Sequence, residues 1–197
     1  HGMVNTSCPL FLSVGQLINH SGEASSHYTA LLNIAWLDNV ATLVTPGTAL
    51  SLTASGAVNN QGGKLTSQGT LNLKAGAVDN SAAGRIATNQ GLTANVASLN
   101  NNAGQLTSVA SLTLDVNKGQ LNNQSGLIRG ATLALNNLAD VGNQSGEISS
   151  AQGFTFAANS LDNTGGKLLS DQGLTLRLDQ ALTNVKGLIS ANGLDAR

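Results

Sequence analysis

The sequence has one cysteine, two prolines and few aromatic or charged side chains. With Cys8 as its only cysteine, the chain cannot form an internal disulfide or a cysteine-based zinc cluster. Charged residues make up 10% of the 197 residues and the formal net charge is −1, which offers no electrostatic surface to nucleic acid. No apolar run reaches the length of a membrane-spanning helix. We therefore expect no nucleic-acid partner and no transmembrane segment.

The composition still favours a folded chain. Hydrophobic residues make up 41% of the sequence, although only 3% of it is aromatic. Glycine and asparagine each occur 23 times. Disordered chains usually carry more charge and more proline, so this composition indicates a thin aliphatic core with many turns.

An asparagine recurs at one fixed place about every twenty residues. Taking the apolar residue two places before it as position zero, the repeats start at Leu17, Leu37, Val58, Val78, Leu99, Leu121, Val141, Leu161 and Leu182. The asparagines at plus two are Asn19, Asn39, Asn60, Asn80, Asn101, Asn123, Asn143, Asn163 and Asn184. Most repeats also have a glycine at plus five and an aliphatic residue at plus seven. Such a fixed period identifies a repeat architecture.

The period within each repeat is two. Stretches such as "TLNLKA", "SLTLDV" and "LTLRL" alternate apolar and polar residues, as a strand with one buried face does. A repeat of this size cannot bury its own apolar face and must stack on its neighbours. The pattern predicts an all-β fold, a parallel β-helix (solenoid) of about nine coils with 20–22 residues each. A leucine-rich repeat, the rival at this period, needs a denser leucine frame.

The recurrent asparagines suggest a ladder. Stacked strands lie about 4.7–4.9 Å apart, and an amide carries both donors and an acceptor. Side chains stacked at that spacing can therefore hydrogen-bond one to the next along the rod. Asparagine also tolerates the left-handed backbone of a sharp corner, so corner conformation is a second explanation. We expect a structural ladder at a corner of the coil.

Segments such as "VNNQGGKLTSQGTLNLKAG" (58–76) and "LDNTGGKLLSDQGLTLRLD" (161–179) resemble filamentous-haemagglutinin repeats. The resemblance runs from about Leu17 to Arg197. It implies a right-handed β-helix in a large bacterial exoprotein exported by two-partner secretion, either an adhesin or a contact-dependent growth-inhibition protein. It further implies a secreted or cell-surface location, an outer-membrane transporter partner, and a host or bacterial surface receptor or glycan reached through the parent protein.

The repeats also set expected boundaries. Residues 1–16 are predicted as a lead-in segment or partial coil, and residues 17–197 as β-helix repeats whose last coil is truncated. Unpaired strand edges at that end favour end-to-end self-association. The first repeat holds Trp36, Tyr28, His20 and His27. We expect its aromatics to fill the core or cover its end, and a histidine pair alone is weak evidence for a metal site.

Catalytic residues do not emerge from the pattern. Polysaccharide hydrolysis needs two carboxylates close together. The corner acids Asp38, Asp79 and Asp162 never fall in adjacent repeats, and Asp115 and Asp179 are three repeats apart. We expect no catalytic, cofactor or metal site and no enzymatic activity. A β-helix enzyme acting on polysaccharide is the alternative.

One polar column suggests a surface role. The plus-six residues should face solvent, because plus seven faces the core. Lys64 and Arg85 are neighbours in this column and are candidates for binding an anionic glycan. Glu147 and Lys167 are also neighbours and are predicted to pair. The main functional expectation is a structural shaft or spacer of a large exoprotein.

Overall fold

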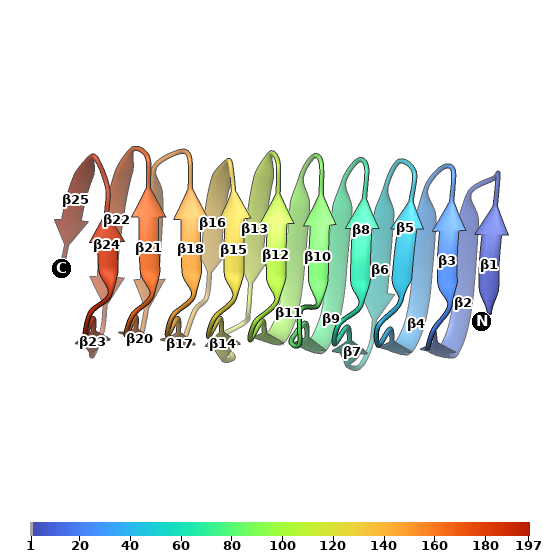
Figure 1. Ribbon diagram of the computed structural model, residues 1–197, viewed down its shortest axis with the longest axis horizontal. Helices are drawn as coiled ribbons and strands as arrows, with labels where there is room; N and C mark the ends of the chain where they lie inside the picture. Colours follow the sequence, from blue (N-terminus) through green and yellow to red (C-terminus); the bar gives the residue numbers. More distant parts are fainter. Residues whose placement is uncertain (1) are drawn as a thin grey trace.

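The computed structural model describes residues 2–197 as one continuous β-coil (Figure 1). Every regular element in this range is a strand. The chain ascends on the near side of Figure 1, turns over, descends on the far side, and advances from β1 toward β25. This path is a right-handed coil, the hand that parallel β connections adopt. The predicted parallel β-helix is confirmed.

Short strands stack along one side of the rod as a ten-strand sheet. They are β1 (Met3–Thr6), β3 (Glu23–Ser26), β5 (Leu43–Pro46), β8 (Lys64–Ser67), β10 (Arg85–Thr88), β12 (Gln105–Ser108), β15 (Leu127–Gly130), β18 (Glu147–Ser150), β21 (Lys167–Ser170) and β24 (Leu188–Ser190). The residues expected as a lead-in thus contribute a strand to the stack.

The return path forms a twelve-strand sheet and a three-strand sheet. In the former are β2 (Leu10–Ile18), β4 (Ala30–Asp38), β6 (Leu50–Ala54), β7 (Val58–Asn59), β9 (Leu71–Asp79), β11 (Leu92–Asn100), β13 (Ser111–Asp115), β14 (Leu121–Asn122), β16 (Thr132–Asn136), β17 (Asp140–Gly142), β20 (Ser160–Asp162) and β23 (Leu182–Thr183). The latter contains β19 (Phe154–Ala158), β22 (Gly173–Leu178) and β25 (Gly193–Ala196).

All strand pairs are parallel, and each residue pairs with its equivalent in the next coil. Met3 pairs with Glu23, 20 residues on, and Leu99 pairs with Leu121, 22 residues on. Ten stacked strands at the usual spacing give a rod about 43 Å long. This register places any fixed position of the repeat in a straight column along the rod.

The interior is aliphatic because the period-two alternation turns one set of side chains inward. The plus-seven column is fully buried from Val44 to Leu168, at 0–1% exposure. The position-zero column and the paired leucines of the return strands fill the rest of the core. Phe156 is the one aromatic among the largest fully buried side chains. The thin core inferred from composition is therefore continuous through the coils.

The aromatic residues near the amino end lie outside this core. Tyr28 is 54% exposed, and Trp36 on β4 is only partly buried. The expectation that they fill the core is wrong: Tyr28 lies in the bend between β3 and β4, and Trp36 lies where the alternation of β4 breaks, directly before the buried Leu37. That they cover the end of the core stays a prediction.

Most large exposed apolar side chains lie in the terminal coils. Leu194 continues the column of the buried Leu174 and has no coil stacked on it, whereas Phe11 stands in an outward column with Leu31 and Ser51.

Candidate functional site

The nine recurrent asparagines form a hydrogen-bonded ladder along one corner. Each Nδ2 donates to Oδ1 of the asparagine in the next coil, from Asn19 through to Asn184, over donor–acceptor distances of 2.7–2.9 Å. The seven inner members are 0% exposed. Because neutral amides satisfy one another here, the aliphatic rod can bury them without leaving polar atoms unpaired.

Each ladder amide also ties the corner backbone together. Nδ2 of Asn101 donates to the carbonyl of Gly104 in its own turn at 3.3 Å and to that of Leu127 in the next coil at 3.2 Å. None of the nine asparagines has a positive φ. The left-handed residue is at plus four instead, at positions including Ala41, Gly62 and Ser125. The alternative explanation by corner conformation is therefore wrong.

The glycine at plus five is required by close approach to the previous coil. A Cβ on Gly104 would lie 2.0 Å from the carbonyl oxygen of Asn80, and one on Gly166 would lie 2.0 Å from that of Asn143. The second coil is the exception: it carries Thr42 at plus five, buried, with its hydroxyl donating to Oδ1 of Asn39 at 2.7 Å. The glycine column thus allows the coils to approach closely enough for the ladder amides to meet.

A second buried polar column, which sequence analysis missed, occupies the opposite corner at plus nine. Its members are Ser26, Ser67, Thr88, Ser108, Ser150 and Ser170, all 4–6% exposed. Each hydroxyl donates to a backbone carbonyl of the preceding coil, as Ser150 does to Ala131 at 3.2 Å, and accepts an amide N–H two residues on. The recurrence of Ser and Thr at plus nine was the available signal.

The corner acids are dispersed, as their sequence spacing predicted. Amides of Asn59 and Asn100 donate to Asp38 and Asp79 respectively, at 3.2 and 3.1 Å. Burial raises the pKa of the Asp79 carboxyl, but hydrogen bonds from Ser81, Gln61 and Asn100 outweigh it and hold the pKa below its ordinary value. These carboxylates are capped individually by neutral donors, which is a structural arrangement.

Asp162 and His20 extend the same outer edge. Hydrogen bonds from the hydroxyl and amide of Thr164 lower the pKa of Asp162. His20 Nε2 lies 2.8 Å from Oδ2 of Asp38. Within residues 2–197 no three His, Cys, Asp or Glu side chains group as a metal site, and no helix could cross a membrane.

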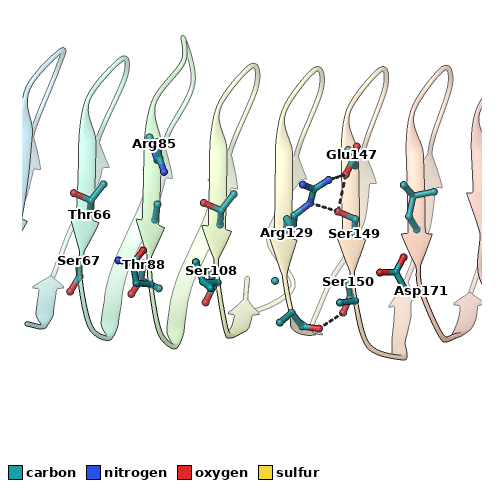
Figure 2. A pocket seen from close by; sticks show the side chains of 18 of the residues that line it. Thr66, Ser67, Arg85, Thr88, Ser108, Arg129, Glu147, Ser149, Ser150 and Asp171 are labelled. Carbon is teal, nitrogen blue, oxygen red and sulfur yellow. Dashed lines mark hydrogen bonds and ion pairs between the residues drawn. The ribbon is translucent and has the colours of Figure 1, made fainter.

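An open groove of 760 Å³ crosses the outer face of the ten-strand sheet. Its walls come from β8, β10, β12, β15, β18 and β21 and from the turns that follow them. Figure 2 shows Arg129 reaching across to Glu147, with Ser149 beside both. Ser149 Oγ donates to Glu147 at 2.8 Å, and Nε of Arg129 donates to Ser149 at 3.0 Å.

The predicted pairing of Glu147 with Lys167 is corrected by this cluster. Glu147 forms its ion pair with Arg129, which sits one coil back at plus eight and has the longer reach. Burial raises the pKa of Glu147, but hydrogen bonds from Ser149 and Arg129 and the charges of Arg129 and Lys167 lower it overall. Lys167 therefore acts on Glu147 through charge, and the carboxylate stays ionised.

The surface-binding candidates lie on the same face, on strands nearer the amino end than the Arg129–Glu147 pair. Lys64 and Arg85 are register partners on β8 and β10, and both are exposed. The structure assigns neither an ion pair within residues 2–197. Arg85 lines the groove (Figure 2). Their binding role stays a prediction.

The family model described as haemagglutinin repeat matches residues 10–84, 66–155 and 130–197. No curated protein and no solved structure matches the chain. The three matches overlap and together span the coils and their asparagine ladder. The chain belongs to the haemagglutinin-repeat family.

Proposed function

We propose that this chain is a stiff shaft segment of a large bacterial exoprotein and holds another region of that protein away from the cell. The observation that carries the proposal is the unbroken parallel register from β1 to β24. A rod whose strands pair only with adjacent coils grows in length in proportion to the number of its coils. The buried ladder supports stiffness, because bending would stretch hydrogen bonds along one corner.

The family supports a structural and adhesin-type role. Two-partner secretion, an outer-membrane transporter and display on the cell surface are parts of this proposal. The parent protein is either an adhesin or a contact-dependent inhibition protein, and its receptor or glycan is contacted beyond or along the shaft. The polysaccharide-enzyme alternative has no supporting observation: only Glu147 and Asp171 contribute carboxylates to the large groove, and Glu147 is held by Arg129.

Distance measurement between two labels tests the stiffness. In a Cys8→Ser background, spin labels at His27→Cys and Asp171→Cys lie at the same exposed position of coils that are seven rungs apart. We expect one narrow distance distribution near 34 Å plus the label linkers. A broad or multimodal distribution would contradict a stiff shaft.

A deletion supplies the matched control. Removing residues 121–160 takes out two complete coils and leaves the repeat in phase. The labelled distance should shorten to about 24 Å with unchanged width. Loss of the β circular-dichroism signal on deletion would mean that the coils are not modular, and the shaft proposal would fail.

The terminal coils carry a separate part of the proposal, end-to-end association of this chain. Leu182, Leu188 and Leu194 at one end and Phe11 at the other are exposed, and the strand edges beside them are unpaired within residues 2–197. Exposed edges of this kind pair with other strands. In analytical ultracentrifugation the average mass of the protein should rise with its concentration, and Leu194→Lys should reduce this rise. A protein that stays monomeric at millimolar concentration would refute association.

A further inference from the structure

The return face of the rod is interrupted at one place within residues 2–197. Strand β16 pairs with β13 in the preceding coil and β19 pairs with β22 in the following coil, but β16 and β19 belong to different sheets and do not pair with each other. The flanking strands of the same two coils are joined, β15 to β18 and β17 to β20. The interruption is therefore confined to one side of one interface between coils.

A difference of one residue in length accounts for the interruption. Two backbone hydrogen bonds, both of 3.0 Å, close the interface before and after the strands: from the amide of Gln152 to the carbonyl of Ala131, and from the amide of Asn159 to the carbonyl of Ala139. Between these bonds, residues 132–138 face residues 153–158, so the first segment is one residue longer. A slip of register by one residue reverses which side chains face the core, so the strands cannot absorb the difference by sliding.

The longer segment takes up its extra residue at Asn137, whose φ of 51° lies in the left-handed region. The inward side chains of Leu135 and Leu138 are consequently three positions apart, whereas those of Phe156 and Ala158, which face them, are two positions apart. An extra residue of this kind bends the strand that carries it. The two segments therefore follow different paths between their closed ends.

Solvent reaches the edge of the core at this interruption. A hollow of 640 Å³ is lined by two inward side chains, Leu133 and Leu135, as well as by outward ones of β16 and β19. Both leucines are 6% exposed, whereas their register partners one coil earlier, Leu112 and Leu114, are 0–1% exposed. Separating β16 from β19 thus breaks no strand pairing and uncovers leucines that water already touches.

The ten-strand face of the same interface is held by side chains. Arg129 forms an ion pair with Glu147 in the next coil and donates to Oγ of Ser149 there at 3.0 Å (Figure 2). Within residues 2–197 this is the only ion pair that joins an arginine or lysine to a carboxylate of another coil. The ladder also crosses the interface, from Nδ2 of Asn123 to Oδ1 of Asn143 at 2.8 Å. The interface is therefore closed on one face and open on the other.

We propose that this interface is a built-in joint, at which β16 separates from β19 and the rod bends toward its ten-strand face. The ladder and the Arg129 ion pair are the pivot, because they join the coils on the side that stays closed. At the other interfaces the same bend would have to break paired return strands, so opening concentrates at this one. The joint is a property of the coils and holds whether or not the rod serves as a shaft.

Three pairs of spin labels, each five rungs apart at exposed positions of a Cys8→Ser background, test the joint. One pair spans the joint on the return face, a second lies on the return face but stops short of it, and a third spans it on the ten-strand face. They are, in that order, Lys74→Cys with Arg177→Cys, Asn33→Cys with Asn136→Cys, and Lys64→Cys with Lys167→Cys.

A closed interface gives about 24 Å plus the label linkers for every pair. We expect the first pair alone to show a distance distribution about twofold wider, with a tail toward longer distances. The third pair, close to the pivot, should keep one narrow distance. A first pair as narrow as the second would overturn the joint. Equal broadening of all three pairs would also overturn it, and would refute the stiff shaft as well.

Removal of the ion pair tests the pivot. Arg129→Gln should enlarge the long-distance tail of the first pair about twofold, because one link on the closed face is lost. Arg85→Gln is the matched control, an exposed cation of the same face to which the structure assigns no ion pair within residues 2–197, and should leave the tail unchanged. An equal response to the two substitutions would refute the part that Arg129 plays in the joint.

Discussion

Two corners of the same coil bury polar side chains in an aliphatic rod, and they do so differently. At the asparagine corner, side chains bond to side chains through nine successive coils. At the hydroxyl corner, each Ser or Thr bonds only to backbone groups, and the column is interrupted by Pro46 and Gly130. The difference follows from chemistry, because an amide can donate and accept at once along one line.

The comparison teaches which polar columns tolerate exceptions. Removing one amide leaves a neighbour on each side without its partner, so the ladder is cooperative. Removing one hydroxyl affects only its own carbonyl and amide contacts. A repeat protein can therefore vary the second column one coil at a time, but not the first. Substitutions at each corner test this difference directly.

The largest effect is expected for Asn101→Leu in the middle of the ladder. The change removes the partner of the Asn80 donor and of the Asn123 acceptor. Unsatisfied buried groups cost roughly 1–3 kcal/mol each, so the free energy of unfolding should fall by about 3 kcal/mol. Denaturant melts measure the shift.

Two controls sharpen this prediction. Asn72→Leu on the exposed face of β9 should change stability by no more than about 0.5 kcal/mol. Asn184 belongs to the same column but is exposed in the last coil. The loss of stability in Asn184→Leu should therefore lie between those of Asn101→Leu and Asn72→Leu. Equal midpoint shifts for Asn101→Leu and Asn72→Leu would remove the energetic case for the ladder.

The next largest loss of stability is expected for Gly104→Ala. The new Cβ would lie 2.0 Å from the Asn80 carbonyl oxygen, and the coils must separate to admit it. We expect a loss of about 2 kcal/mol. Gly173→Ala, whose new Cβ would lie 3.9 Å from the Gly193 carbonyl oxygen, is the matched control and should be close to neutral. A neutral Gly104→Ala would show that this corner has spare room.

A smaller loss, about 1 kcal/mol, is expected for Ser150→Ala at the hydroxyl corner. The variant loses the bond to the Ala131 carbonyl and the one accepted from the Gln152 amide. In thermal or urea melts, the loss of stability in Ser150→Ala should be much smaller than that in Asn101→Leu. If the two variants were equally unstable, the proposed contrast between cooperative and independent columns would be wrong.

The smallest effect concerns pH. Because the pKa of Glu147 is lowered on folding, its stabilisation is present above the ordinary glutamate range and is lost as pH falls through the folded value. At neutral pH the free energy of unfolding of the wild type should exceed that of Glu147→Gln by less than about 1 kcal/mol. The urea midpoints of the two proteins should converge as pH falls through the folded pKa of Glu147; a gap that widens in acid would reverse the assigned sign.

The fold and the ladder were accessible from sequence because both depend on a fixed offset. Asparagine repeats at plus two in every coil, and only column geometry explains that regularity. The left-handed position was not accessible, because its occupants differ: Ala41, Gly62, Ser125 and Lys186 share a backbone conformation but no side-chain chemistry. Only the structure shows that the left-handed backbone of the turn lies at plus four.

The charge cluster was predicted incompletely for a related reason. Column arithmetic aligns residues at the same offset and so paired Glu147 with Lys167. It does not include side-chain reach between offsets, and Arg129 at plus eight reaches Glu147 from the preceding coil. The hydroxyl column was missed although its signal existed, because Ser and Thr are also ordinary turn residues.

The constant register has a consequence for how the rod is made. Every paired residue finds its partner 20–22 positions along the chain, so closing each coil costs the same loop entropy. No contact needs to wait for a distant part of the sequence. A chain delivered one end first can therefore complete one coil after another in the order of arrival, each finished coil acting as the template for the next.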